Sequence, residues 1–315
     1  MEDISLKLSQ IPSKFFSLCS DENYRYDLID KYIYRKLPDE TYLKRRFYHD
    51  LGYKLNLANP KTFNEKMQWL KLHDRNPSYC RMVDKYEAKK YVASIIGNEY
   101  IIPTIGVWDR FEDIEFDDFP KQFVLKCTHD SGGLAICKDK NTFDYNEARY
   151  WINSSLKMNY YRCLREWPYK DVKPRIIAEK YMEDSSTKQL RDYKIHSFNG
   201  TPKVVLVCRN RYSEEGMTED FFDVDWNHLD VRREKNGNST VSISKPKELE
   251  EMLSLSHRLS KDIPFLRTDF YVVNGRVYFG ELTFFPASGL GKFIPESFDE
   301  QMGEWLKLPI EEQNT

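Results

Sequence analysis

Long apolar runs are missing from this sequence of 315 residues. A helix that spans a membrane needs about 20 consecutive apolar residues, whereas the best local run extends only from Val204 to Cys208. The opening residues, Met1 to Ser5, include Glu2 and Asp3 and contain no apolar signal core. We therefore expect neither a membrane span nor an export signal, and a cytoplasmic protein.

Paired metal-ligand motifs are also missing. The six cysteines are scattered, with no Cys-x-x-Cys motif and no pair of histidines to complete a zinc site. This pattern excludes a zinc centre and a disulfide framework as organising features. We expect buried thiols in a reducing compartment.

The net charge is small, because 48 Lys and Arg residues are balanced by 50 Asp and Glu residues to give −2. Such a balance argues against a whole-surface basic field and hence against a nucleic-acid partner. Hydrophobic residues make up 40% and aromatic residues 15% of the chain, which is enough to bury a sizeable core. The length allows two or three domains.

Helix signals dominate the first third of the chain. Pro38 opens a helical segment that Gly52 ends, Thr62 and Glu65 have the spacing of a capping box, and Asp84 starts another helix. Residues 31–47 combine lysines and arginines with tyrosines and a phenylalanine. Two interpretations of this basic stretch stay open: a solvated helix face, or a surface for an anionic membrane or glycan.

Strand signals take over from about Gln122. Short apolar strands are expected at Phe123–Cys127 and Leu134–Cys137, and Asn199-Gly200 and Asn274-Gly275 are strong signals for two hairpins. Helices interrupt these hairpins, so the pattern predicts an α+β fold rather than a doubly wound one.

Two motifs carry candidate chemistry. Lys126 ends a strand before the segment 128–133, whose small residues would let backbone N–H groups approach phosphate oxygens. Asp269 and Glu281 lie on the two strands of the second hairpin, where their carboxylates should lie close together. Like charges in such apolar strands need a compensating cation, and magnesium on a triphosphate would supply one.

Taken in order, these motifs resemble the ATP-grasp superfamily and its D-alanine–D-alanine ligases. The segments 59–66, 83–86, 123–133, 192–194 and 280–289 are similar to the TupA-like branch, which is associated with teichuronopeptide and cell-surface polysaccharide biosynthesis. The resemblance covers about residues 55–308. It implies an ATP-grasp fold in which a nucleotide lies between two α+β lobes, with a helical N-terminal extension before them.

The resemblance implies a role for each matching residue. The magnesium ligands would be Asp269, Glu281 and Thr283, although the family usually has an asparagine at the last position. Arg267 would steady the transferred phosphoryl group. The residues implied to bind ATP are Lys85, Lys126, His129, Ser131, Gly132, Gly133, Glu179, Lys180, Tyr181, Met182, Asp192 and Lys194.

The implied activity is ligation of a carboxylate to an amine, with ATP and Mg²⁺ as cofactors, an acyl-phosphate intermediate, and release of ADP and phosphate. Arg209, Arg211, Arg267 and Lys292 are candidates to bind the acceptor carboxylate, since arginine pairs with it through two parallel hydrogen bonds. We expect an acidic sugar or amino acid as acceptor, an amine as second substrate, and peripheral contact with membrane-linked glycan machinery through the basic stretch.

The expected organisation has four segments: a helical extension at 1–60, a helical linker at 61–120, a small lobe at 121–182 and a large lobe at 183–315. Two alternative functions stay open. Asp223-Val224-Asp225 is an Asp-x-Asp motif of the kind that holds a metal-bound nucleotide sugar in glycosyltransferases. The chain could also be a non-catalytic glycan-binding protein that keeps the fold.

Overall fold

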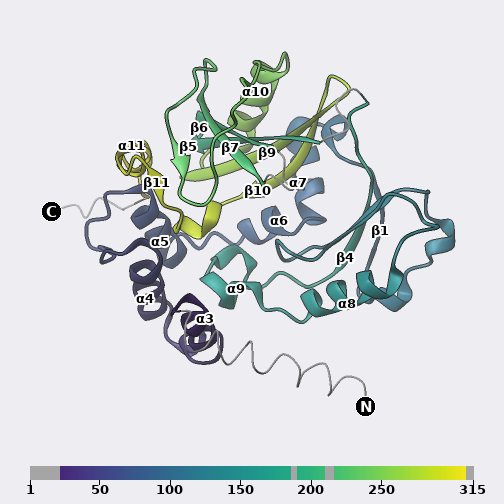
Figure 1. The fold of residues 1–315 in the computed structure, drawn as a ribbon, viewed down its shortest axis with the longest axis horizontal. Coiled ribbons are helices and arrows are strands. Elements are labelled where there is room, and N and C mark those ends of the chain that lie inside the picture. The colour runs from purple at the N-terminus through teal and green to yellow at the C-terminus, as the bar shows by residue number, and fades with distance from the viewer. Residues whose placement is uncertain (1–21, 186–189, 210–215, 310–315) are drawn as a thin grey trace.

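A computed structural model describes residues 22–185, 190–209 and 216–309. Two antiparallel sheets form separate lobes, and a group of helices from the N-terminal part of the chain lies beside both (Figure 1). In the view of Figure 1 the larger sheet lies at the top and the smaller one at the right. The expected α+β architecture with a helical N-terminal region is confirmed.

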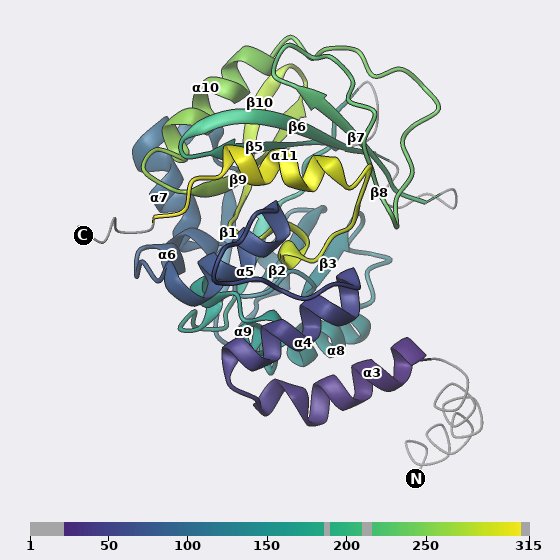
Figure 2. The same ribbon diagram turned by 90° about the vertical axis from the view of Figure 1, so that its left-hand side faces the viewer.

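The N-terminal helices are α3 (Glu22–Tyr32), α4 (Asp39–Leu51) and α5 (Phe63–His73). Helix α4 ends at Gly52, whose φ of 84° is the left-handed conformation that glycine adopts without steric penalty. Helix α5 begins with the expected capping box, in which Thr62 and Glu65 each bind the other's backbone N–H. Figure 2 shows α5 between α4 and α11 (Ser297–Trp305), so this region is packed onto the body of the protein.

The small lobe is a four-stranded sheet with the order β1-β4-β2-β3. Its strands are β1 (Thr104–Trp108), β2 (Phe123–Cys127), β3 (Leu134–Cys137) and β4 (Ile176–Lys180). Helix α8 (Tyr145–Leu156) packs on this sheet through Ile152 and Ala148, and α9 (Tyr160–Leu164) follows it. Because β1 belongs to this sheet, the lobe begins before the boundary at residue 121 that the sequence suggested.

The large lobe is a five-stranded sheet with the order β10-β9-β5-β6-β7. Both of its expected hairpins form around the Asn-Gly turns, and both turn asparagines have positive φ. Helix α10 (Leu249–Leu259) covers one face of this sheet. The strands are β5 (Arg191–Phe198), β6 (Thr201–Arg209), β7 (Thr218–Asp223), β9 (Phe265–Val273) and β10 (Arg276–Thr283).

Helices from the expected linker complete the core of the large lobe. The apolar faces of α5, α6 (Tyr79–Val83) and α7 (Glu87–Ile96) join the strands in one cluster that contains Met67, Val92 and Phe270. The segment 61–100 therefore packs as part of this lobe. The remaining short elements are β8 (Arg232–Arg233), β11 (Phe293–Ile294), η1 (Tyr34–Lys36), η2 (Asn98–Tyr100), η3 (Phe111–Asp113), η4 (Phe116–Asp118), η5 (Trp167–Tyr169) and η6 (Pro286–Gly289).

Within the described residues, no helix combines the length and the apolar character needed to cross a bilayer.

Candidate active site

A β-bulge brings the two predicted metal-binding carboxylates together. Gly280 is an extra residue in β10, so Glu281 is paired with Asp269 rather than with Thr268. A one-residue change of register moves side chains to the other face of a sheet. The bulge therefore decides that the two carboxylates share a face.

Two cations compensate the Asp269 carboxylate, which is 1% exposed. Arg267 donates through Nε to Asp269 Oδ1 at 2.6 Å and through Nη2 to Oδ2 at 2.7 Å. The same Nη2 donates to Glu281 Oε1 at 2.9 Å, so Arg267 connects both carboxylates. Burial lowers the pKa of Arg267, but Asp269 and Glu281 outweigh it, and the net result is a raised pKa.

Lys194 is the second cation of this group. It lies on β5 directly opposite Asp269 and binds that carboxylate, and its Nζ lies 2.8 Å from Asp192 Oδ2. Burial lowers the pKa of Lys194, and the neighbouring Asp269 raises it above its usual value. Asp192, which the resemblance implied to bind ATP, is thus buried within the charged cluster on the sheet.

The predicted phosphate loop is held in shape by Asp130. Its Oδ2 accepts a hydrogen bond from the Gly133 backbone N–H at 2.9 Å and another from Ser155 Oγ on α8. A Cβ atom on Gly133 would lie 2.7 Å from both Cys127 Sγ and Ser155 Oγ, so only glycine fits there. The exposed tip of the loop is formed by Ser131 and Gly132, where backbone groups face solvent.

Lys85 connects this loop to the large lobe. Its Nζ donates to the carbonyl oxygen of Cys127 at 3.0 Å and to that of Asp130. Burial lowers the pKa of Lys85, and Asp130 opposes this shift. Lys85 and Glu281 line the same small pocket, of about 20 Å³, together with Gly280 and Tyr169. The pocket therefore brings a predicted phosphate-binding lysine beside a predicted metal ligand.

His129 takes a different position from the rest of the loop. It is 3% exposed, and its Nε2 lies 3.2 Å from the backbone oxygen of Ser155 on α8. Burial lowers the pKa of this imidazole, which favours its neutral form. The structure thus favours the packing interpretation of His129 over contact with phosphate.

Glu179 lies between two lysines at the end of β4. Its Oε2 is 2.6 Å from Lys126 Nζ, and its Oε1 pairs with Lys89 Nζ. Burial raises the pKa of Glu179, but Lys126 and Lys89 outweigh this effect and lower it to about 2. The sequence analysis missed Lys89, because nothing in its helical context distinguishes it from other lysines on α7.

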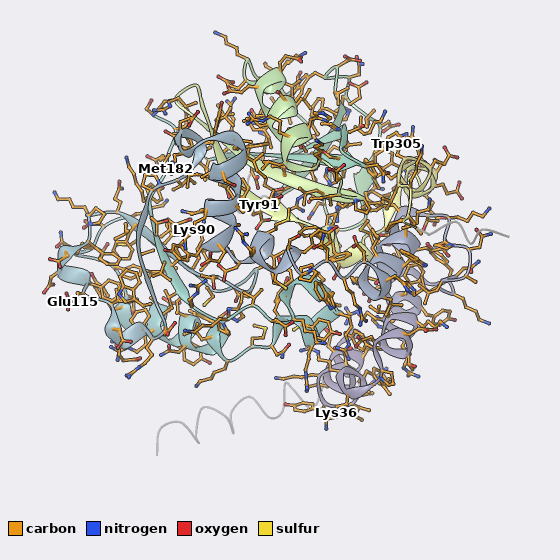
Figure 3. The ribbon with its side chains drawn as sticks, turned by 180° about the vertical axis from the view of Figure 1, so that it is seen from behind. Lys36, Lys90, Tyr91, Glu115, Met182 and Trp305 are labelled. Carbon is orange, nitrogen blue, oxygen red and sulfur yellow. The ribbon has the colours of Figure 1, made fainter. Side chains whose placement is uncertain are left out.

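Three of the residues that the resemblance implies to bind ATP follow Glu179: Lys180, Tyr181 and Met182. Lys180 is exposed, and its backbone N–H donates to the Pro103 carbonyl oxygen at 3.0 Å. Tyr181 and Met182 are half-buried, and Tyr181 Oη donates to Glu183 at 3.2 Å. Met182, labelled in Figure 3, marks where the chain leaves the small sheet. These three residues are therefore at least partly open to solvent, with Lys180 opposite Phe123 in the sheet.

The candidates for binding the acceptor carboxylate differ in position and exposure. Arg209 ends β6 and is half-buried, while Lys292 is 41% exposed, with its Nζ 3.7 Å from Glu234 Oε1. Arg211 lies outside the described residues. Among the three candidates that the structure describes, only Arg267 is fixed within the carboxylate cluster.

The Asp-x-Asp motif has a structural role. Asp223 Oδ1 accepts hydrogen bonds from the backbone N–H groups of Asp225 at 3.0 Å and Asn227 at 2.8 Å, as in an Asx turn. Asp225 itself is exposed. This geometry accounts for Asp223 without a nucleotide sugar.

The donor set on the hairpin fits magnesium. Asp269 and Glu281 provide carboxylate oxygens, and Thr283 Oγ1 donates to Glu281 Oε1 at 3.3 Å. In the part of the chain that the structure describes, no group of three or more His, Cys, Asp or Glu side chains could hold a metal alone. Magnesium commonly binds to one or two carboxylates and completes its shell with water and substrate phosphates. The hairpin meets this requirement.

Two α+β lobes, with Lys85 and Glu281 in one pocket and Asp269 paired with Glu281, form the arrangement expected of an ATP-grasp protein. The chain matches the TupA-like ATPgrasp family over residues 65–307, and it belongs to that family. No curated protein matches it.

Similar solved structures include two D-alanine–D-alanine ligases. D-alanine–D-alanine ligase from Bacillus anthracis, complexed with ATP, is 18% identical; the match covers 64% of this chain and 53% of that one, with a TM-score of 0.36. The corresponding enzyme from Helicobacter pylori is 15% identical over 72% of this chain and 61% of that one, with a TM-score of 0.39.

A third similar structure is the ATP-grasp ligase PsnB complexed with a minimal precursor. It is 8% identical over 67% of this chain and 54% of that one, with a TM-score of 0.39. The chain thus spans between half and two thirds of the length of these three structures.

Proposed function

We propose that this protein is an ATP-dependent carboxylate–amine ligase, which forms an amide through an acyl phosphate and releases ADP and phosphate. The observation that carries the proposal is the shared pocket of Lys85 and Glu281, beside the cluster in which Arg267 connects Glu281 to Asp269. Membership of the TupA-like ATPgrasp family supports it.

The roles of the residues follow from their charges and positions. Lys85 and Lys126 would neutralise phosphate oxygens, and Ser131 and Gly132 at the loop tip would cover them. Asp269 and Glu281 would hold Mg²⁺, which supplies Lewis-acid stabilisation of the phosphoryl oxygens when bound. Arg267 would orient these carboxylates and contact the transferred group.

Water must be excluded from such a site, because an acyl phosphate hydrolyses readily. The hinge at Lys180–Met182 would receive the adenine next to Lys126, whose ammonium group is held by the buried Glu179. Lys194 would balance Asp192 and Asp269 when the nucleotide is absent. No protein nucleophile is required for this chemistry.

We further propose an acidic sugar or amino acid as the carboxylate substrate, in cell-surface or capsular polysaccharide biosynthesis, and a cytoplasmic location. The five cysteines in the described part of the chain are all free thiols, which suits a reducing compartment. Peripheral contact with membrane-linked glycan machinery through residues 31–47 remains part of this proposal.

The direct test measures ADP and phosphate release from Mg-ATP with a panel of uronic acids and amines. We expect release that depends on both an acid and an amine, together with an amide product detected by mass spectrometry. Release of AMP, or failure to bind Mg-ATP in a calorimetric titration, would overturn the proposal.

A further inference from the structure

The loop after β10 has an uncommon backbone conformation. Three consecutive residues, Ala287, Ser288 and Gly289, have positive φ values of 47°, 57° and 60°. Two of these are not glycine, and such residues rarely adopt this region unless the surrounding structure enforces it. Contacts from neighbouring segments must therefore hold these three residues in this conformation.

Helix α5 supplies the first set of these contacts. Gln68 Nε2 donates to the carbonyl oxygens of Ser288 at 3.1 Å and Gly289 at 2.7 Å, and Lys71 Nζ donates to the Ser288 carbonyl oxygen at 2.8 Å. A Cβ atom on Gly289 would lie 2.3 Å from Met67 Cβ, so the helix and the loop are in direct contact.

Glu166 supplies the second set, from the segment between α9 and η5. Ser288 Oγ donates to Glu166 Oε1 at 2.5 Å and accepts from Lys71 Nζ at 3.2 Å. Lys71 is 2% and Glu166 7% exposed. A serine hydroxyl thus joins a buried cation to a buried anion, and this arrangement compensates charges that would be unfavourable alone.

This buried group lies close to the proposed phosphoryl-transfer residues. Tyr169, in the turn that follows Glu166, lines the pocket shared by Lys85 and Glu281. The loop itself follows the strand that carries Glu281 and leads to Lys292. The loop therefore joins the strand of a proposed metal ligand to a candidate for binding the acceptor carboxylate.

We propose that Lys71, Gln68 and Glu166 form a positioning unit that holds the loop 286–289 as one wall of the acceptor subsite. In this arrangement α5 contributes to acceptor affinity without touching the nucleotide. The inference rests on the proposed ligase function, because it names the part of that site which receives the carboxylate substrate.

The test compares Lys71→Met with a matched control on the same helix, Lys66→Met. Lys66 Nζ donates to the carbonyl oxygens of Gly303 and Leu306, each at 2.7 Å. It therefore binds the C-terminal part of α11 and not the loop 286–289. Both variants lose a partly or fully buried ammonium group that donates to backbone oxygen, but only Lys71→Met removes contacts to the loop, namely those to the carbonyl oxygen and hydroxyl of Ser288.

The first measurement is hydrogen–deuterium exchange of the full-length free protein. We expect exchange in residues 286–292 to rise at least tenfold in Lys71→Met and to stay within twofold of wild type in Lys66→Met. Unchanged exchange of this segment in Lys71→Met would overturn the positioning role, whatever the enzyme's substrates prove to be.

The second measurement is the kinetics of phosphate release with the uronic acid that gives the highest rate. We expect Lys71→Met to raise the KM for this acid at least tenfold while Mg-ADP affinity, measured by calorimetry, stays within twofold. An unchanged acid KM beside increased loop exchange would overturn the role in acceptor binding.

Absence of acid-dependent release in the wild-type protein would overturn both the proposed function and the acceptor role. The exchange measurement would still decide whether Lys71 positions the loop.

If Lys71→Met does not fold because Glu166 is left as an uncompensated buried charge, Lys71→Met/Glu166→Gln removes both charges. This double variant loses the same contacts to Ser288, so the same rise in exchange and in KM is expected. Wild-type values for both quantities in the folded double variant would overturn the proposal.

Discussion

Glu179 shows how a single buried carboxylate can organise two basic side chains before the nucleotide arrives. Lys126 and Lys89 come from different elements, and each would repel the other without the anion between them. The carboxylate is 4% exposed and stays ionised, because the two ammonium groups lower its pKa to about 2. Glu179 thus fixes Lys126 where a phosphate or adenine edge can reach it.

This arrangement predicts a defined pH dependence of stability. The folded-state pKa of Glu179 is about 2 and the unfolded value is about 4.5, so its charge stabilises the folded state above pH 4.5. This contribution, up to about 3 kcal/mol, is lost as the pH falls from 4.5 through 2. Urea unfolding of wild type and Glu179→Gln should differ most at pH 6–7 and converge toward pH 3. A constant difference across this range would contradict the prediction.

The buried carboxylate of Asp269 is central to the proposed active site. Asp269→Asn keeps the size of the side chain but removes the charge that Arg267 and Lys194 compensate and that the proposed Mg²⁺ site requires. We expect turnover to fall at least a thousandfold, with Mg-ATP binding weakened and the circular dichroism spectrum unchanged. Asp225→Asn, at an exposed carboxylate outside the site, is the matched control and should keep wild-type turnover. Unfolding of Asp269→Asn would instead indicate a structural role.

At the scale of elements, the two Asn-Gly hairpins were predictable because a two-residue turn leaves little choice of register. The bulge at Gly280 was not, since one extra residue in a strand leaves no periodic signal. The sequence also did not predict strands β1 and β7. Strand β1 is a short edge strand, and β7 ends at Asp223, the first residue of the Asp-x-Asp motif. The sequence therefore indicated which residues lie near the hairpin but could not indicate how Glu281 comes to face Asp269.

The phosphate loop gives a prediction at the same scale. Gly133→Ala places a Cβ atom 2.7 Å from Cys127 Sγ and Ser155 Oγ, so strand β2 and helix α8 must move apart. Overpacking of this kind typically lowers the free energy of unfolding by about 1–3 kcal/mol. Gly132→Ala is the matched control, because nothing lies within 4 Å of its added Cβ atom. Chemical denaturation of both variants checks the difference, and equal stabilities would show that the loop is not fixed by this contact.

At the scale of the whole molecule, the sequence suggested an N-terminal extension, and the structure shows how these helices are attached. Arg165, at the end of α9, is 3% exposed and donates to Asp39 Oδ1 at 2.8 Å and to the Arg35 carbonyl oxygen at 2.8 Å. Tyr42 Oη on α4 donates to the Cys163 carbonyl oxygen at 2.5 Å. These contacts join residues more than 100 positions apart, and local patterns carry no information about such pairs.

Arg165 and Glu166 are neighbours in sequence, so the same short segment binds α4 on one side and the loop 286–289 on the other. Loosening α4 should therefore disturb the proposed active site from a distance. Arg165→Met removes the buried guanidinium that also lies 4.2 Å above the Tyr42 ring, and with it the ion pair to the half-buried Asp39. We expect faster proteolytic cleavage within residues 22–51 and increased hydrogen exchange at 286–292.

Arg45→Met is the matched control, because it removes an exposed arginine stacked on Tyr34 of the same helical region. It should leave both the cleavage rate and the exchange unchanged. Faster cleavage of the helices without any change at 286–292 would show that the two sides of the segment are independent.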